Sequence, residues 1–172
     1  MARRVEVYQA LVVPGLLQTS DYGRALFEAV EDVVDVDQGV AMRLERQKIL
    51  DSEEPPQLRV LLKQSVLEDP VGGPVVMKAQ LAHLLKVSTR PNVHVRVLPR
   101  SKGVHVGLDG SFMLIQGRRG ECGYIEAVDG GRLITDPTKL SSLRVRLDRI
   151  GDDALPREAS RELILRLMER MT

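Results

Sequence analysis

The sequence has few of the residues that hold disulfide-rich folds and metal sites together. Its 172 residues include one cysteine and three histidines. The lone Cys122 cannot form an internal disulfide. Zinc sites of four cysteines, or of two cysteines and two histidines, are also excluded. We therefore expect no metal and no cofactor, and a disulfide-stapled secreted fold is ruled out.

Aromatic clusters and long apolar runs are missing too. Aromatic residues make up 3% of the chain and there is no tryptophan, so a base-stacking platform for RNA is not evident. The apolar runs, such as residues 12–17 with Pro14 and Gly15 inside, are far shorter than the roughly 18 to 20 residues that span a bilayer. No apolar signal core follows residues 1–4. We expect a cytoplasmic protein that does not bind membranes.

The net charge of +1 conceals a marked asymmetry. Residues 28–54 carry nine acids and three bases, whereas residues 86–119 carry seven bases and one acid. One interpretation is two solvated faces that attract each other within the fold. The other is a basic surface that faces a partner. Near-neutrality disfavours non-specific nucleic-acid binding without disfavouring a charged partner.

Apolar residues recur at helical spacing in several segments. The first helix follows a Pro-Gly turn and begins at Thr19 or Ser20, either of which can cap it. The next covers about 37–51, a third contains Met77 and ends before Pro91, a fourth begins at 136–137, and the last covers about 156–171. In the third helix, the residues assigned to the polar side are Lys78, Gln80, His83 and Lys86.

Short apolar runs predict strands at 58–62, 93–98, 111–115, 123–127 and 132–135. The first two flank the third helix and form a β-α-β unit with parallel strands. The next two form a hairpin joined by residues 118–121. The predicted fold is α+β (mixed α/β), with a small mixed sheet flanked by N-terminal and C-terminal helices. We expect one domain over 1–172, with a helical part at about 14–52, a sheet core at 57–135 and C-terminal helices at 136–171.

Residues for acid/base chemistry occur around a glycine-rich loop. His105 has a titratable imidazole and precedes Asp109 by four residues, and Glu126 follows the hairpin. In the alternative interpretation the glycines simply make the turn and Asp109 bonds its own backbone. Glu126 and Asp129 could hold a hard cation, although such acids are more often solvent-facing.

A second group of residues suggests binding rather than catalysis. Gly72 and Gly73 precede a helix whose free N–H groups could hold an anion. The lysine and serine or threonine of a phosphate-binding loop are missing, as is a dinucleotide fingerprint. The predicted ligand- or partner-binding set is Gly72, Gly73, Arg96, Arg100, His105, Asp109, Tyr124 and Glu126.

An ordered series of short motifs runs along nearly the whole chain. It consists of VPGLLQT at 13–19 with DY at 21–22, RLERQ at 43–47, PVGGP at 70–74, PNV at 91–93, GLDGSF at 107–112 and YIE at 124–126. Over roughly residues 5–170 the series resembles a domain of unknown function. That domain follows an Xre-type helix-turn-helix in regulators of Streptomyces and related actinobacteria, often described as antitoxin-like.

The resemblance implies a regulatory domain that binds a small partner protein or a small-molecule ligand, and it allows a homodimer. DNA contact is expected only through the helix-turn-helix, which this chain lacks. The chain is either a trimmed regulator or a stand-alone version. It also carries Lys63 and Gln64 where related sequences commonly have an acidic pair, which would alter any cation or basic-partner site there.

A different class of function stays open beside the regulatory one. A stand-alone copy could be a cofactor-independent isomerase, cyclase or hydrolase of a specialised-metabolite pathway. His105 would then act with Asp109 or Glu126 as acid and base.

Overall fold

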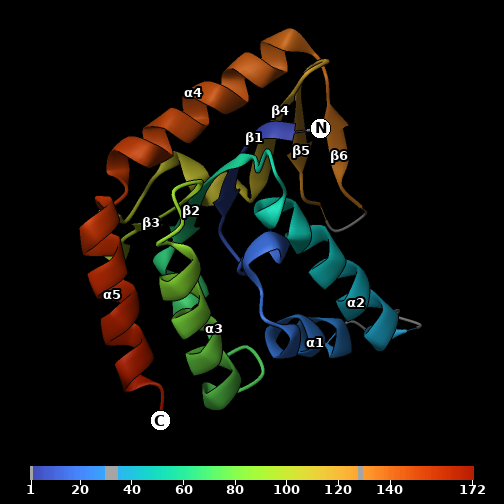
Figure 1. Cartoon of the computed structure of the whole chain (residues 1–172). Helices are drawn as coiled ribbons and strands as arrows, with labels where there is room; N and C mark the ends of the chain where they lie inside the picture. The colour runs from blue at the N-terminus through green and yellow to red at the C-terminus, as the bar shows by residue number, and fades with distance from the viewer. Residues whose placement is uncertain (1, 30–34, 128–129) are drawn as a thin grey trace.

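The computed structural model describes residues 2–29, 35–127 and 130–172 (Figure 1). Within these residues the chain forms a six-stranded mixed sheet with the order β3-β2-β1-β4-β5-β6. The first three strands in that order are parallel, and the remaining pairs are antiparallel. The strands are β1 (Ala2–Gln9), β2 (Gln57–Lys63), β3 (Val93–Leu98), β4 (Phe112–Gly117), β5 (Gly120–Ile125) and β6 (Arg132–Ile134).

Helices precede, connect and follow the strands. The α-helices are α1 (Ser20–Glu28), α2 (Val36–Gln47), α3 (Pro74–Val87), α4 (Pro137–Asp153) and α5 (Arg157–Arg170). Short 3-10 helices are η1 (Gly15–Leu17), η2 (Lys48–Asp51), η3 (Gln64–Leu67), η4 (Arg100–Lys102) and η5 (Val106–Asp109). None of the helices in the described ranges is both long enough and apolar enough to pass through a membrane.

One face of the sheet carries the larger core. Alternate positions of the parallel strands, such as Val7, Val60 and Val95, point to this face and meet Leu81 of α3 and Ile164 of α5. Figure 1 shows α3 and α5 side by side. The apolar stripes that predict these two helices are the ones buried here.

The opposite face is covered by α4. Leu140, Leu147 and Ile150 of this helix pack with Tyr8 and Leu114 from the central strands. Asp136 caps the helix, its carboxylate accepting from the Lys139 N–H at 2.9 Å. Helix α4 therefore covers the strand side chains that point away from the larger core.

The α+β class, the β-α-β unit and the hairpin are confirmed, whereas one strand was missed and two local expectations are wrong. Strand β1 was not predicted, although it occupies the centre of the sheet. The hairpin register pairs Gly117 with Gly120, so the loop is Arg118 and Arg119 rather than four residues. Gln80, assigned to a polar helix side, is fully buried.

The two oppositely charged segments contact each other in the fold. Arg90 pairs with Asp51 at 2.9 Å, and Arg118 pairs with Glu54 at 3.4 Å. Each pair joins the basic segment to the acidic one. Part of the charge asymmetry is therefore neutralised internally, which supports the first of its two interpretations.

Candidate functional site

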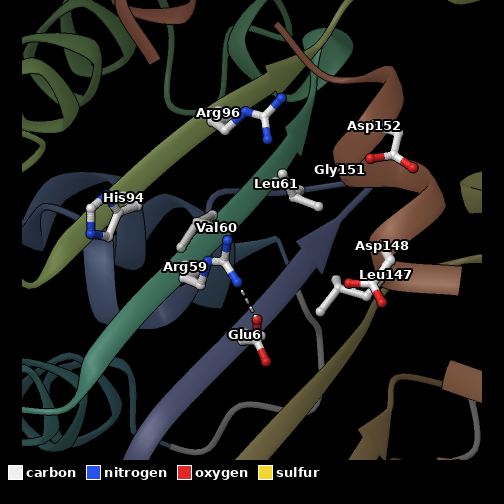
Figure 2. Close-up of a pocket in the computed structure, with 10 residues that line it drawn as sticks. All are labelled: Glu6, Arg59, Val60, Leu61, His94, Arg96, Leu147, Asp148, Gly151 and Asp152. Atoms are coloured by element: carbon white, nitrogen blue, oxygen red, sulfur yellow. Dashed lines mark hydrogen bonds and ion pairs between the residues drawn. The ribbon is translucent and has the colours of Figure 1, made fainter. Parts of the chain in front are cut away.

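A groove of about 370 Å³ lies between α4 and the parallel part of the sheet. Its lining comes from β1, β2 and β3 on one side and from the second half of α4 on the other (Figure 2). Two structural elements thus form opposite walls, and the side chains of each wall can meet a molecule placed between them.

Strand register sets the polar side chains of the sheet wall in rows. Glu6 of β1 is paired with Arg59 of β2, and Arg59 is paired with His94 of β3. The next row toward α5 holds Leu61 and Arg96. Because residues two apart in a strand share a face, the pattern that buries the valines on one side places these residues on the other.

Glu6 is a buried carboxylate held by two guanidinium groups. It is 4% exposed. Arg59 Nη1 lies 3.0 Å from one of its oxygens, and Arg144 Nη1 lies 3.1 Å from the other. Arg144 also pairs with Glu121 of β5. Since a buried carboxylate is costly without partners, this network fixes the floor of the groove and fastens α4 to β1 and β5.

Arg96 fastens the other end of α4. Its Nε donates to the carbonyl of Leu155 at 2.8 Å, and its Nη2 donates to the carbonyl of Ala154 at 2.6 Å. These carbonyls lie at the C-terminal end of α4. There the last carbonyl oxygens of a helix have no intrahelical donor, and the helix dipole favours a cation. The sequence predicts Arg96 as a binding residue, and the structure places it in the groove with much of its donor capacity already used.

The helix wall presents two carboxylates. Asp148 and Asp152 are four residues apart on α4, and both line the groove with Leu147 and Gly151. Neither aspartate takes part in an ion pair with any of the described residues. The wall therefore carries negative charge that the described protein groups do not neutralise by direct contact.

His94 adds a titratable group to the sheet wall. Burial and the positive charges of Arg157 and Arg59 lower the pKa of His94 from its ordinary value of 6.5. The imidazole is consequently neutral at pH 7, so it can donate or accept a hydrogen bond but adds no charge.

His105 lies away from this groove, in the loop before η5. Its Nδ1 accepts from the Gly107 N–H at 3.1 Å, and its ring meets the edge of Tyr8 with centroids 6.4 Å apart. Burial, assisted by the charges of Lys63 and Lys102, lowers the pKa of His105. The imidazole thus has a structural task as the cap of η5.

Asp109 and Glu126 have separate partners. Asp109 pairs with Arg146 of α4, whereas Glu126 accepts from Gln9 Nε2 at 3.0 Å. Among the described residues, no hydrogen bond joins either carboxylate to the His105 side chain. Asp129 lies outside the described residues. The acid/base mechanism stays a prediction, and the structure adds no contact in its favour.

The glycine pair precedes α3 on the opposite face from the groove. Gly73 has φ +88° and Gly72 has φ +70°, which explains glycine at both positions. A Cβ at Gly72 would lie 2.9 Å from Val76 and 3.0 Å from Ala25. Their geometry serves the turn into the helix, and anion binding there stays a prediction.

The two remaining predicted residues also lie outside the groove lining. Arg100 of η4 pairs with Glu68 at 2.5 Å. Tyr124 of β5 packs so closely on Gly131 that a Cβ there would overlap the phenol. Arg96 is thus the member of the predicted set that reaches the groove.

The match to a known family covers nearly the whole fold and ends within α5. Residues 1–166 match the model of a family described as "Domain of unknown function (DUF5753)". The chain belongs to the DUF5753 family. The resemblance to a domain of unknown function is therefore confirmed. No curated protein and no solved structure matches the chain.

The DUF5753 domain has a second, more apolar cavity of about 330 Å³ near the first half of α4. Phe112, Ile125 and Leu143 contribute its apolar lining, and Asp109 and Arg146 lie among its polar residues. Because these two are paired with each other, Lys139 is left as the charged lining residue without an ion pair to the described residues, whereas the groove has both Asp148 and Asp152.

Sequence reasoning missed most of the groove of the DUF5753 domain. Glu6 and Arg59 are each the polar position between two apolar residues, in VEV at 5–7 and LRV at 58–60. Asp148 and Asp152 follow Leu147 at a spacing that puts them on one side of a helix. These signals are local, but only the sheet register shows that they converge.

Proposed function

We propose that this DUF5753 chain is the ligand-binding regulatory domain of an antitoxin-like, Xre-type transcriptional regulator, and that the groove between α4 and the sheet is its ligand site. One observation carries the proposal. The groove brings charges of both signs to a partly enclosed space, and Asp148 and Asp152 form no ion pair there with described residues. Concave sites with a few convergent polar groups are the usual places for small ligands.

The size of the groove favours a small molecule over a partner protein. A volume of about 370 Å³ lies at the lower end of the range for ligand pockets. A stable protein interface needs about 800 Å² of surface from each partner, and it is not organised around a cleft of this size. We therefore take a cytoplasmic metabolite as the ligand, ahead of the small partner protein.

The anchoring of α4 offers a route from ligand to response. Ion pairs from Arg144 and hydrogen bonds from Arg96 fix the helix at points on both sides of the groove. A ligand that contacts both walls changes the free energy of docking α4 on the sheet. In a regulator with a helix-turn-helix, a shift in α4 is the signal passed to that DNA-binding module.

The test is retention of a small molecule. The purified chain is mixed with a metabolite extract of its source cells, freed of unbound compounds by gel filtration, and examined by native mass spectrometry. We expect the wild type to retain a compound that the double variant D148N/D152N loses. The control is E158Q/E162Q, which removes two exposed carboxylates of α5 with the same spacing.

Two outcomes contradict the proposal. If neither protein retains a compound, the groove is not a metabolite site. If wild type and D148N/D152N retain the same compound equally, the ligand binds elsewhere.

A further inference from the structure

The helix wall of the groove carries the negative charge that no ion pair offsets. Glu6 is paired with Arg59 and Arg144, whereas Asp148 and Asp152 form no ion pair with the described residues. With His94 neutral at pH 7, the balance favours a ligand that carries more positive than negative charge. An isolated anion such as phosphate would meet the acidic wall of α4, so it is disfavoured.

The charges that are not used by the fold have a definite arrangement. Glu6 is satisfied by Arg59 and Arg144, and Arg96 donates its Nε and Nη2 groups to backbone carbonyls. Arg59 uses Nη1 for Glu6 and is 59% exposed, which leaves Nε and Nη2 available for a ligand. The groove therefore offers two carboxylates on the helix and, on the sheet, the free edge of Arg59 beside the Nη1 group of Arg96.

The spacing of the two carboxylates sets the spacing of the cations they can bind. Residues four apart on a helix are separated by about 6 Å along the axis, and Figure 2 shows both aspartates on the part of α4 that borders the groove. Two ammonium groups joined by four or five carbon atoms span this distance. Between the charged groups lie Leu61 and Leu147, which are 9% and 5% exposed, so the apolar surface that they offer to methylene groups is small.

We infer that the groove binds a free diamino acid of the lysine or ornithine type. Its two ammonium groups lie against Asp148 and Asp152, its carboxylate lies against Arg59, and its methylenes cover Leu61 and Leu147. The inference rests on the proposed function and names the ligand class for the same site. One such molecule would pair with the free carboxylates of the helix wall and with the free guanidinium edge of the sheet wall.

Calorimetric titration with three matched probes at pH 7.5 tests the ligand class. L-lysine has all three charged groups, cadaverine lacks the carboxylate, and L-norleucine lacks the second ammonium group. We expect L-lysine to bind most tightly. Each missing group should weaken binding about tenfold or more, as expected for a lost charge-assisted hydrogen bond.

Variants assign each group to its partner. D152N should weaken L-lysine and cadaverine about tenfold. R59Q should weaken L-lysine by a similar factor and leave cadaverine unchanged, because cadaverine has no carboxylate. R149Q, which removes an exposed arginine of α4 outside the groove lining, is the control and should bind all three probes like wild type.

The inference is overturned if L-norleucine binds as tightly as L-lysine, or if D152N binds L-lysine unchanged. Failure of the inference and of the proposed function can be told apart. A compound retained from the extract by wild type and lost by D148N/D152N, together with no heat from L-lysine, overturns the diamino acid alone. No retained compound and no heat from any probe overturn both.

Discussion

The side-chain Nε2 of Gln80 lies 2.7 Å from the carbonyl oxygen of Leu17. Its Oε1 accepts from the Thr19 N–H, also at 2.7 Å. The amide is fully buried, so one polar side chain of α3 satisfies two backbone groups of the turn that leads from η1 into α1. This contact holds the first helix against the larger core.

Replacing Gln80 by leucine should destabilise the fold. The change keeps the approximate volume but leaves the Leu17 carbonyl and the Thr19 N–H without this partner. Each buried unsatisfied group costs about 1 to 3 kcal/mol. Urea unfolding should show the loss, while K78Q, an exposed change on the same helix, should leave the midpoint in place. An unchanged midpoint for Q80L would contradict the role assigned to the amide.

Replacing Glu6 by glutamine should lower the free energy of unfolding by about 1 to 3 kcal/mol, the range for hydrogen bonds to charged groups. Its two arginines are partly exposed, with side-chain exposures of 59% and 35%, so solvent moderates the loss. Denaturant titration measures the effect, with E158Q as the exposed control. If E6Q and E158Q unfold alike, the buried network does not hold α4.

Acidification should destabilise the chain through its histidines. Burial is the first cause that lowers the pKa of His83, with Arg90 and Lys86 adding to it. The folded pKa is thus below the unfolded value of about 6.5, and the unfolded state takes up protons first as the pH falls. Stability is fully present above the unfolded pKa and is lost as the pH falls through the folded one.

The matching measurement compares wild type with H83Q at pH 7.5 and pH 5.0. Other groups titrate equally in both proteins, so the difference between their pH-dependent losses isolates His83. We expect the smaller loss for H83Q. Equal losses would show that protonation of His83 does not contribute to the pH dependence of stability.

Replacing Tyr8 by phenylalanine should leave the chain as stable or make it more stable. The Tyr8 hydroxyl is buried with no hydrogen-bond partner among the described residues, and burial raises its pKa to about 12. Removing an unsatisfied hydroxyl relieves a desolvation cost of about 1 to 3 kcal/mol. Thermal unfolding gives the sign directly, and a clear drop in the melting temperature of Y8F would reveal a partner for the hydroxyl, such as buried water.

Helices and the β-α-β unit were predictable because their signals are local. Capping by Thr19 and Asp136 and the apolar stripe around Leu81 can be read within one turn or two. Strand β1 was missed because its partners are distant in sequence. The segment also contains three charged residues, Arg3, Arg4 and Glu6, so it does not have a continuous apolar run.

The candidate site was mostly beyond prediction for a related reason. Glu6, Arg59 and His94 become neighbours through strand register, and register depends on which strands pair. Arg96 was anticipated from its place in the basic segment, but its bonds to the end of α4 depend on the path of that helix. Its place in a glycine-rich loop makes His105 a candidate acid or base, whereas in the fold it caps η5.

The central position of β1 has a consequence for how the chain acquires its structure. Its neighbours in the sheet are residues 57–62 on one side and 112–117 on the other. During synthesis, which proceeds from the N-terminus, this strand is therefore made long before its second neighbour. Such non-local pairing slows folding and leaves strand edges open in the meantime. Translation must pass Arg144 of α4 before the network at the floor of the groove can form.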